Sequence, residues 1–457
     1  MTYLLPNMTN DLNKLTAISP IDGRYLSQAI YLSNYFSEYA LFKYRVEIEL
    51  RYLIFLSREG VARKITQKEE KQIMEIYENF SLKDAQKIKD FEKETKHDVK
   101  AVEYFIRQKF SQTPLSSLTN LIHFGLTSND INDNAYRLMI KDALRETIIP
   151  EINGLVIILD SIAGKYIKLP MLARTHGQAA VPSTFGKEIL VFSSRLKKEL
   201  AFLNKIELFG KFGGSVGNWN SLKFAFPEKD WPAISTKFLK TLGLNHSKIT
   251  TQIAPPEDII EIFQLFIRIN NVLVDLNQDL WRYISDDWVV QKGKERDVGS
   301  STMPQKINPI EFENSEGNLA VANGLFETFS RKLPISRLQR DLSESTVLRN
   351  IGVAFSHSLI AYKSCLKGLK SISPNKGKIL KDLNEDWSIL SEALQTILRK
   401  EGKTDAYESV AAQIRGKKIN KDGWLKLVKS LNISEESKNK LKNLTPENYI
   451  GITLNKW

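Results

Sequence analysis

Residues 257–285 read EDIIEIFQLFIRINNVLVDLNQDLWRYIS, and this stretch decides the fold class. Polar side chains recur along it at steps of three and four residues, at Glu261, Gln264, Arg268, Asn271, Asp275, Gln278 and Arg282. A segment with this period is helical, and a helix that is apolar around most of its circumference is buried among other helices. At 1.5 Å per residue it would be about 43 Å long. We therefore expect a long helix inside a bundle.

Other segments carry the same helical periodicity, and they occupy residues 29–57, 66–110, 128–149, 152–168, 183–209, 311–330 and 344–371. Alternating strand patterns are almost absent, and we interpret RTHGQAAVPS, residues 174–183, as a loop. The sequence predicts an all-α protein with an elongated bundle of long helices. Because so long a buried helix needs many neighbours, we also expect helices shared between subunits.

The length of 457 residues exceeds the usual limit of roughly 250–300 residues for one core, so several domains are expected. Breaks in the helical pattern lie at Thr113-Pro114 and from Pro374 to Gly377. They predict an N-terminal helical domain at 1–114, a central long-helix bundle at 115–373 and a C-terminal helical domain at 374–457.

The net charge of +12 allows a nucleic acid, an anionic membrane or an acidic small molecule as partner. Basic and acidic residues are mixed almost everywhere, so we interpret the surplus mainly as a solvated surface, with a minor share directed at an anionic ligand. We expect no nucleic-acid partner. No run of about 18 uninterrupted apolar residues occurs, and the first residues lack the basic and apolar regions of a signal peptide, so we expect no membrane partner.

Cys365 is the single cysteine, so no disulfide can form within the chain. This favours a reducing compartment, and we expect a cytoplasmic protein with Cys365 as a buried filler. Three of the five histidines, His97, His123 and His176, lie in polar breaks between helices. No two of them have the spacing of metal ligands, so we expect neither a metal nor another cofactor.

Residues 299–309, GSSTMPQKINP, combine adjacent hydroxyls, an ammonium, an amide and two prolines. We interpret this stretch as a mobile loop that closes over an anion. It resembles the signature of the fumarase/aspartase superfamily, whose members release fumarate from a substituted succinate. The resemblance implies the three-domain, all-α fold of that superfamily.

Six further segments are similar to the adenylosuccinate lyase family, in its bacterial form: SPIDGRY (19–25), TKHDVKAVEYF (95–105), TSND (127–130), RTHGQ (174–178), RDLSESTVLRN (340–350) and LTPENYIG (444–451). The likeness covers about Leu15 to Gly451 in the same order. It implies β-elimination of fumarate from adenylosuccinate, giving AMP, and from succinylaminoimidazole carboxamide ribotide, in purine nucleotide biosynthesis.

Three alternatives stay open: another fumarate-releasing lyase of the argininosuccinate lyase or aspartase type, a catalytically silent homologue, and a basic nucleic-acid binder. The last is the weakest, because the sequence contains no recognised nucleic-acid module.

The resemblance also implies residue roles. Ser300 matches the general base and His176 the general acid. Lys306 and Asn308 match residues that hold the succinyl carboxylates, and Glu313 matches the carboxylate that hydrogen-bonds the acid histidine. Its negative charge would favour the imidazolium form, which keeps a proton available.

Thr127 and Ser128 lie at a predicted helix N-terminus, which suits a carboxylate. The resemblance assigns phosphate and ribose contacts to Arg24, Tyr25, Arg340, Ser345 and Arg349. It assigns further substrate contacts to Lys96, His97, Asp98 and Gln252. Close relatives often have asparagine at position 96, where a lysine would add charge attraction. The family implies a homotetramer with active sites shared between subunits and an anionic nucleotide as substrate.

Overall fold

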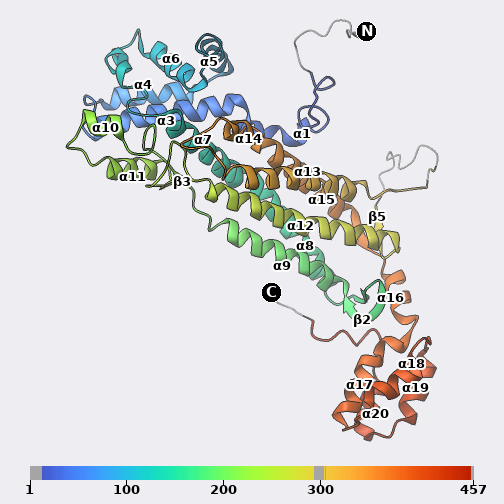
Figure 1. Ribbon diagram of the computed structural model, residues 1–457. Helices are drawn as coiled ribbons and strands as arrows, with labels where there is room; N and C mark the ends of the chain where they lie inside the picture. The colour runs from blue at the N-terminus through green and yellow to red at the C-terminus, as the bar shows by residue number, and fades with distance from the viewer. Residues whose placement is uncertain (1–12, 293–302, 304, 454–457) are drawn as a thin grey trace. The chain divides into compact units, whose positions relative to one another are not determined.

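The computed structural model describes residues 13–292, 303 and 305–453 (Figure 1). The chain divides into two compact units. Unit 1 comprises Met1–Ile152, Glu199–Asn271 and Gly317–Lys363, and unit 2 comprises Asn153–Lys198, Val272–Glu316 and Ser364–Trp457. This division groups segments that are distant in the sequence. The three consecutive domains expected from the sequence stay a prediction.

Five long helices have residues in both units: α8 (Ile149–Tyr166), α9 (Phe185–Leu203), α12 (Glu257–Ser285), α13 (Ile310–Lys332) and α15 (Ile351–Ser371). The other helices of unit 1 are α1 (Leu26–Ala29), η1 (Ile30–Leu32), α2 (Ser33–Phe36), α3 (Glu38–Arg58), α4 (Gln67–Glu78), α5 (Leu82–Thr95), α6 (Asp98–Phe110), η2 (Pro114–Leu121), α7 (Ser128–Ala143), η3 (Leu144–Ile148), α10 (Asn220–Ala225), α11 (Trp231–Thr241) and α14 (Ser343–Leu348). Unit 2 adds α16 (Lys376–Asn384), η4 (Trp387–Leu390), α17 (Ser391–Lys400), α18 (Ala406–Ile414), α19 (Lys421–Ser430) and α20 (Glu435–Lys442).

The predicted helix at 257–285 is confirmed as α12, with the same end residues. Most of its apolar positions are buried, as the periodicity requires. In unit 1 the rings of Phe263 and Phe266 are fully buried, and their centroids lie 5.6 Å from Phe326 and 5.0 Å from Phe355, respectively. Aromatic packing of this kind joins α12 to α13 and α15.

The N-terminal part of unit 1 packs around α3. The start of α3 is capped by Ser37, whose hydroxyl accepts a hydrogen bond from the N–H of Ala40. Capping boxes at Thr66 and Ser81 begin α4 and α5. The buried faces of α3 to α6 form one apolar cluster that includes Val46 and Phe105. This cluster fixes the start of α6, where three predicted site residues lie.

The two helices expected at 128–149 and 152–168 form one continuous helical run, so the break expected there is wrong. Pro150 has no N–H to donate to the carbonyl of Glu146, four residues earlier. The run accommodates it because η3 is a π-helical turn, in which hydrogen bonds span five residues. The helix therefore changes its hydrogen-bond type near Pro150 and is not interrupted.

The run Ser128–Tyr166 contains an 18-residue window that is long and apolar enough to cross a membrane by length and composition, and 33% of that window is buried. A core helix of a globular protein can pass the same test. The beginning of this run buries the charged residues Asp130, Asp133 and Arg137, which would be costly in hydrocarbon. By itself this run is weak evidence of a membrane span.

The loop expected at 174–183 is wrong. These residues belong to an antiparallel hairpin of β1 (Pro170–Thr175) and β2 (Gln178–Thr184), in which Thr175 pairs with Gln178. The two turn residues, His176 and Gly177, have φ of 52° and 72°. Positive φ at both positions is typical of a tight hairpin turn. The segment lacks alternation of polar and apolar residues, so its sequence did not indicate strands.

Two shorter pairings complete the strands described: β3 (Phe209–Gly210) lies parallel to β4 (Asn245–His246), and β5 (Val289–Gln291) lies antiparallel to β6 (Ile372–Pro374). In the last part of unit 2, α16 to α20 surround a separate apolar cluster. Trp424 is fully buried there, and its indole N–H donates to the carbonyl of Leu441 at 3.0 Å. Cys365 is buried as expected, and burial raises the pKa of its thiol to about 12.

Candidate active site

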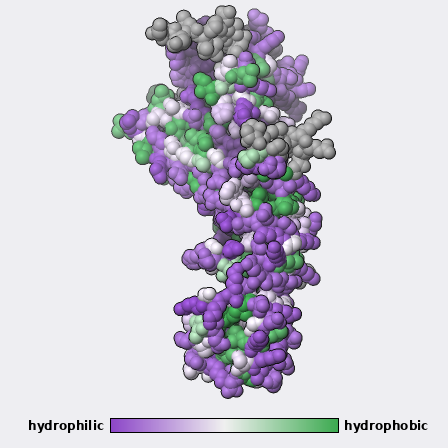
Figure 2. All heavy atoms as spheres, turned by 90° about the vertical axis from the view of Figure 1, so that its right-hand side faces the viewer, coloured by the Kyte–Doolittle hydropathy of each residue, from purple (hydrophilic) through white to green (hydrophobic). Residues whose placement is uncertain are grey.

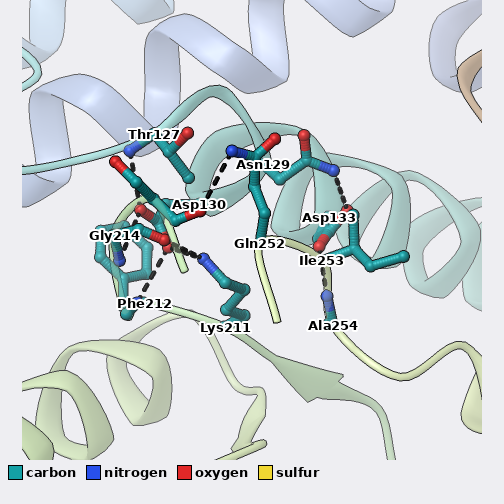
Figure 3. A network of polar contacts seen from close by, with 12 residues as sticks. Thr127, Asn129, Asp130, Asp133, Lys211, Phe212, Gly214, Gln252, Ile253 and Ala254 are labelled. Atoms are coloured by element: carbon teal, nitrogen blue, oxygen red, sulfur yellow. Dashed lines mark hydrogen bonds and ion pairs between the residues drawn. The ribbon is translucent and has the colours of Figure 1, made fainter. Parts of the chain in front are cut away.

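The start of α7 is fixed by a buried carboxylate, Asp130 (Figure 3). Its Oδ2 accepts from the N–H of Thr127 at 2.8 Å and from the N–H of Gly214 at 3.1 Å. Its Oδ1 accepts from Lys211 Nζ at 2.7 Å and from the N–H of Gly213 at 2.9 Å. Four donors on two segments thus hold Thr127 and Ser128 in place. The first N–H groups of a helix have no partner inside it, so this end can receive an anion.

In the same first turn of α7, Asn129 bridges two buried carboxylates. Its Nδ2 donates to Asp133 Oδ1 at 3.1 Å and to Glu344 Oε1 at 3.0 Å. Asp133 Oδ2 accepts from the N–H of Ala254 at 2.6 Å, and Figure 3 shows this bond beside the side chain of Gln252. Burial raises the pKa of Asp133 to about 6, and the nearby charge of Glu344 acts in the same direction. The predicted contact Gln252 therefore lies in a loop that is hydrogen-bonded to α7, and its own Nε2 donates to the carbonyl of Ser215 at 3.1 Å.

The segment that contains Arg340 and α14 (Ser343–Leu348) is hydrogen-bonded to the start of α7 through Glu344. Arg340 donates from Nε to Glu344 Oε1 and from Nη2 to Ser345 Oγ, each at 3.0 Å. Glu344 is 6% exposed. The structure therefore brings together Arg340 and Ser345, which the resemblance assigned to phosphate and ribose, and joins them to α7 through a carboxylate that was not predicted.

A third set of polar contacts forms around Asp98. Its Oδ2 lies 2.7 Å from Arg45 Nη2 and 3.4 Å from Arg349 Nη2. Burial opposes its charge, but the guanidinium groups of Arg45 and Arg349 hold the pKa of Asp98 below its ordinary value. Arg45 also donates from Nε to Asn132 Oδ1 on α7 at 2.8 Å. The predicted residues Asp98 and Arg349 thus lie beside the polar end of α7.

The histidines between helices have separate surroundings. His97 begins α6, where its Nδ1 accepts from the N–H of Lys100 at 3.2 Å. His123 has its Nδ1 2.6 Å from the buried Glu49 Oε1, and although burial opposes the charged form, Glu49 raises the pKa of His123. His176 is exposed at the tip of the β1–β2 hairpin. In unit 1, His97 and His123 thus have different partners, and His176 belongs to unit 2.

Three further predicted contacts, Lys96, Arg24 and Tyr25, lie in other parts of unit 1. Lys96 ends α5 in the left-handed conformation, with φ of 55°. Arg24 is exposed, and Tyr25 packs against a small apolar cluster that includes Ile21 and Ile360. In the described part of unit 1, no hydrogen bond or ion pair joins Lys96 or Arg24 to the polar residues at the start of α7.

The predicted catalytic residues belong to unit 2. Glu313 lies in the first turn of α13, and its Oε1 accepts from the indole N–H of Trp281 at 3.1 Å. Lys306 is exposed, and Asn308 is half-buried just before the same helix. Within the described residues of one chain, Glu313 is not hydrogen-bonded to His176. Ser300 lies outside the described residues.

Sequence reasoning missed Arg45, Asn129, Asp133 and Glu344. A signal was available at the start of α7, where six of the seven residues 128–134 (SNDINDN) are polar. All of these except Ser128 are buried. Buried polar groups need partners, so a helix that is polar on every side indicates a packed hydrogen-bond network.

Comparison with known proteins gives two family matches. The family model described as Lyase matches residues 23–324, and the one described as Adenylosuccinate lyase C-terminal matches residues 336–450. The relatives with curated names include adenylosuccinate lyase of Buchnera aphidicola subsp. Acyrthosiphon pisum, 47% identical, and that of Escherichia coli K12, 42% identical, each alignment covering 96% of this chain and 98% of the relative. Adenylosuccinate lyase of Dictyostelium discoideum is 47% identical, with 96% and 97% covered.

Solved structures show the same fold at lower identity. A fumarate lyase from Mesorhizobium sp. BNC1 has a TM-score of 0.76 at 19% identity, with 92% of this chain and 95% of that chain covered. The β-carboxy-cis,cis-muconate cycloisomerase of Acinetobacter calcoaceticus sp. ADP1 has a TM-score of 0.70 at 19% identity, with 94% and 97% covered. These likenesses concern the fold, and they agree with the all-α architecture expected from the sequence.

Proposed function

The chain belongs to the adenylosuccinate lyase family, and from this premise we propose that it eliminates fumarate from adenylosuccinate to give AMP. It is a carbon–nitrogen lyase of purine nucleotide biosynthesis. The structural observation that carries the proposal is the gathering of Asp98, Arg340 and Arg349 at the polar start of α7, a site suited to a substrate with several negative charges. The reading as argininosuccinate lyase or aspartase is not favoured, because the adenylosuccinate lyase C-terminal model matches residues 336–450.

The same site would accept the second substrate expected from the sequence, succinylaminoimidazole carboxamide ribotide. Both substrates carry a succinyl group at one end and a ribose phosphate at the other. Only the base between these ends differs, so the anion-binding residues can serve both reactions.

The two ends of the substrate go to different elements. Arg349 is assigned to the phosphate, because its side chain is 51% exposed and Asp98 is already paired with the buried Arg45. Arg340 presents the remainder of its guanidinium beside Ser345. The succinyl carboxylates go to the hydroxyls of Thr127 and Ser128 and to the first N–H groups of α7. A guanidinium suits phosphate, and a helix start suits a carboxylate.

Chemistry requires a base, an acid and stabilisation of the developing charge. Ser300 is assigned as the base that removes the carbon proton next to a carboxylate, and His176 as the acid that protonates the leaving nitrogen. Lys306 and Asn308 are assigned to the carboxylate on which negative charge builds, since fixed donors aimed at developing charge lower a barrier. Glu313 is assigned as the hydrogen-bond partner of the acid histidine, and the negative charge of Glu313 favours the imidazolium form.

We further propose a homotetramer in which different chains complete each active site. Its support within unit 2 is a set of exposed large apolar side chains on four helices: Ile157, Val191, Trp281 and Ile310. Figure 2 shows green hydrophobic atoms in several groups among hydrophilic ones on the face that it presents. Contact with another chain would remove these apolar side chains from water. A cytoplasmic location is proposed because the single cysteine is compatible with a reducing compartment.

The first experiment follows ultraviolet absorbance of the purified protein with adenylosuccinate, for the wild type, Ser300→Ala and the neighbouring Ser301→Ala as matched control. We expect conversion to AMP and fumarate, loss of roughly two or more orders of magnitude in Ser300→Ala, and a smaller effect in Ser301→Ala. Equal activity of wild type and Ser300→Ala would keep the reaction and remove Ser300 from its role. No turnover by wild type would move the test to argininosuccinate and aspartate.

A further inference from the structure

Glu344 occupies the junction between the two elements that the proposed function assigns to opposite ends of the substrate. Its Oε1 accepts from Arg340 Nε, on the phosphate side, and from Asn129 Nδ2, at the start of α7 on the carboxylate side, both at 3.0 Å. The side chain is buried. One oxygen atom therefore sets the position of a phosphate-binding guanidinium relative to a carboxylate-binding helix start.

The amide of Asn129 is held in a single orientation. Both hydrogen atoms of its Nδ2 are donated, one to Glu344 and one to Asp133. Its Oδ1 is buried and has no hydrogen-bond partner among the described residues. If the amide rotated by 180°, Oδ1 would face two carboxylates and repel them, so the lone acceptor is left unpaired instead. The link from Asn129 to Glu344 is thus directional and rigid.

The link continues on both sides. Asp133 connects Asn129 to the N–H of Ala254 at 2.6 Å, close to the predicted contact Gln252. On the other side, Arg340 binds Ser345 Oγ at 3.0 Å. A charge-assisted bond to a buried carboxylate is among the stronger contacts in a protein, so these five hydrogen bonds behave as one unit.

From this geometry we propose that Glu344 is a positioning residue that fixes the separation between the phosphate-binding and carboxylate-binding ends of the site, and so selects substrates that span both. The inference rests on the proposed function, since that function assigns the two ends. Glu344 itself touches no reacting atom. It acts through Arg340 and Asn129, and its loss should weaken binding of a ligand that spans both ends more than binding of a ligand that reaches one.

The test compares wild type with Glu344→Gln, Glu344→Asp and Asp341→Asn. Asp341 is a carboxylate of the same segment that binds Ser343 and Arg337, so it is the matched control. For Glu344→Gln we expect KM for adenylosuccinate to rise about tenfold to a hundredfold, kcat to change less than about threefold, and Glu344→Asp to recover part of the loss. The inhibition constant of succinate, which reaches one end, should change less than about threefold.

A double-variant cycle tests whether Glu344 acts through Asn129. If it does, Glu344→Gln should raise KM much less in an Asn129→Ala background than in the wild type. Thermal unfolding of each variant separates folding defects from positioning, and Glu344→Asp serves if Glu344→Gln does not fold.

The possible outcomes separate failure of the role proposed for Glu344 from failure of the proposed reaction. The role proposed for Glu344 is wrong if KM is unchanged in Glu344→Gln, if the effects in the cycle are additive, or if binding of succinate and of adenylosuccinate is weakened equally. Turnover by wild type would still support the proposed function. If wild type has no turnover, calorimetric binding of adenylosuccinate, which spans both ends, to wild type and Glu344→Gln replaces the kinetics, and identical or absent binding overturns the inference as well.

Discussion

The ammonium of Lys211 lies 2.7 Å from Oδ1 of Asp130, and the two side chains are 1% and 0% exposed. The same ammonium donates to the carbonyl of Gly214 at 2.9 Å. Removing two charges from water is costly, and this cost is offset only when the charges pair and their remaining hydrogen bonds are satisfied. The pair therefore ties the loop at 211–214 to the start of α7, the end that is proposed to receive a substrate carboxylate.

Lys211→Met should be strongly destabilising, because it leaves the Asp130 carboxylate buried without its cation. We expect a loss of about 3–5 kcal/mol in the free energy of unfolding, measured by urea denaturation. The control is Lys237→Met, which breaks a pair with Glu59 that is 62% exposed on the lysine side. Exposed pairs contribute about 0–1 kcal/mol. Equal losses in the two variants would contradict the importance of the buried pair.

Asp133→Asn should change the pH dependence of stability. The pKa of Asp133 is raised in the folded protein to about 6 from the ordinary 3.8, so the folded protein binds the proton more tightly. Tighter proton binding stabilises the folded protein fully below about pH 3.8, and this stabilisation is lost as the pH rises through about 6. Between about pH 4 and pH 7, the variant should gain roughly 3 kcal/mol relative to wild type.

The quantity to measure is the slope of the free energy of unfolding against pH. Loss of the hydrogen bond from Asn129 changes that free energy by the same amount at every pH, so it does not alter the slope. Asp341→Asn is the control, because hydrogen bonds to Ser343 lower the pKa of Asp341 to about 2, below this pH window. A flat difference between wild type and Asp133→Asn would show that Asp133 does not titrate there.

Gly125→Ala should destabilise the loop that leads into α7. Gly125 has φ of 70°, and an added Cβ would lie 2.2 Å from Leu222 Cδ2. Gly402→Ala is the matched control, since Gly402 has φ of 80° with nothing within 4 Å of an added Cβ. We expect a loss of about 1 kcal/mol for Gly402→Ala, from backbone strain alone, and at least about twice that for Gly125→Ala, measured by thermal unfolding. Matching losses would mean that Leu222 moves aside freely.

Mixing two inactive variants should restore activity if active sites are shared. Ser300→Ala and His176→Ala each lack one of the proposed catalytic groups. A mixed tetramer formed under conditions of subunit exchange can contain sites with both groups intact, when these come from different chains. Recovery of part of the wild-type rate is expected, and Ser300→Ala mixed with itself is the control. If the mixed sample stays inactive although exchange is demonstrated by mass, the sites are not shared.

The sequence was most informative where a pattern is long or a motif is local. The period of residues 257–285 fixed both ends of α12, because a helix that is apolar on most sides has few alternative environments. It was least informative at 174–183, where the backbone turns at His176 and Gly177 and no alternation marks the strands. At Pro150 it predicted an interruption, since the π-helical turn that absorbs the proline is not encoded by a local signal.

For the site, the sequence by itself determined which residue types are present: the arginines at 340 and 349, the Thr127-Ser128 pair, His176 and the 299–309 stretch. The pairing of these groups was decided only by the tertiary structure. Asn129 and Glu344 are 215 residues apart in the chain, yet they share one hydrogen bond. A hydrogen bond is formed only where two groups meet at about 3 Å in the right direction, and folding rather than sequence distance decides which groups meet.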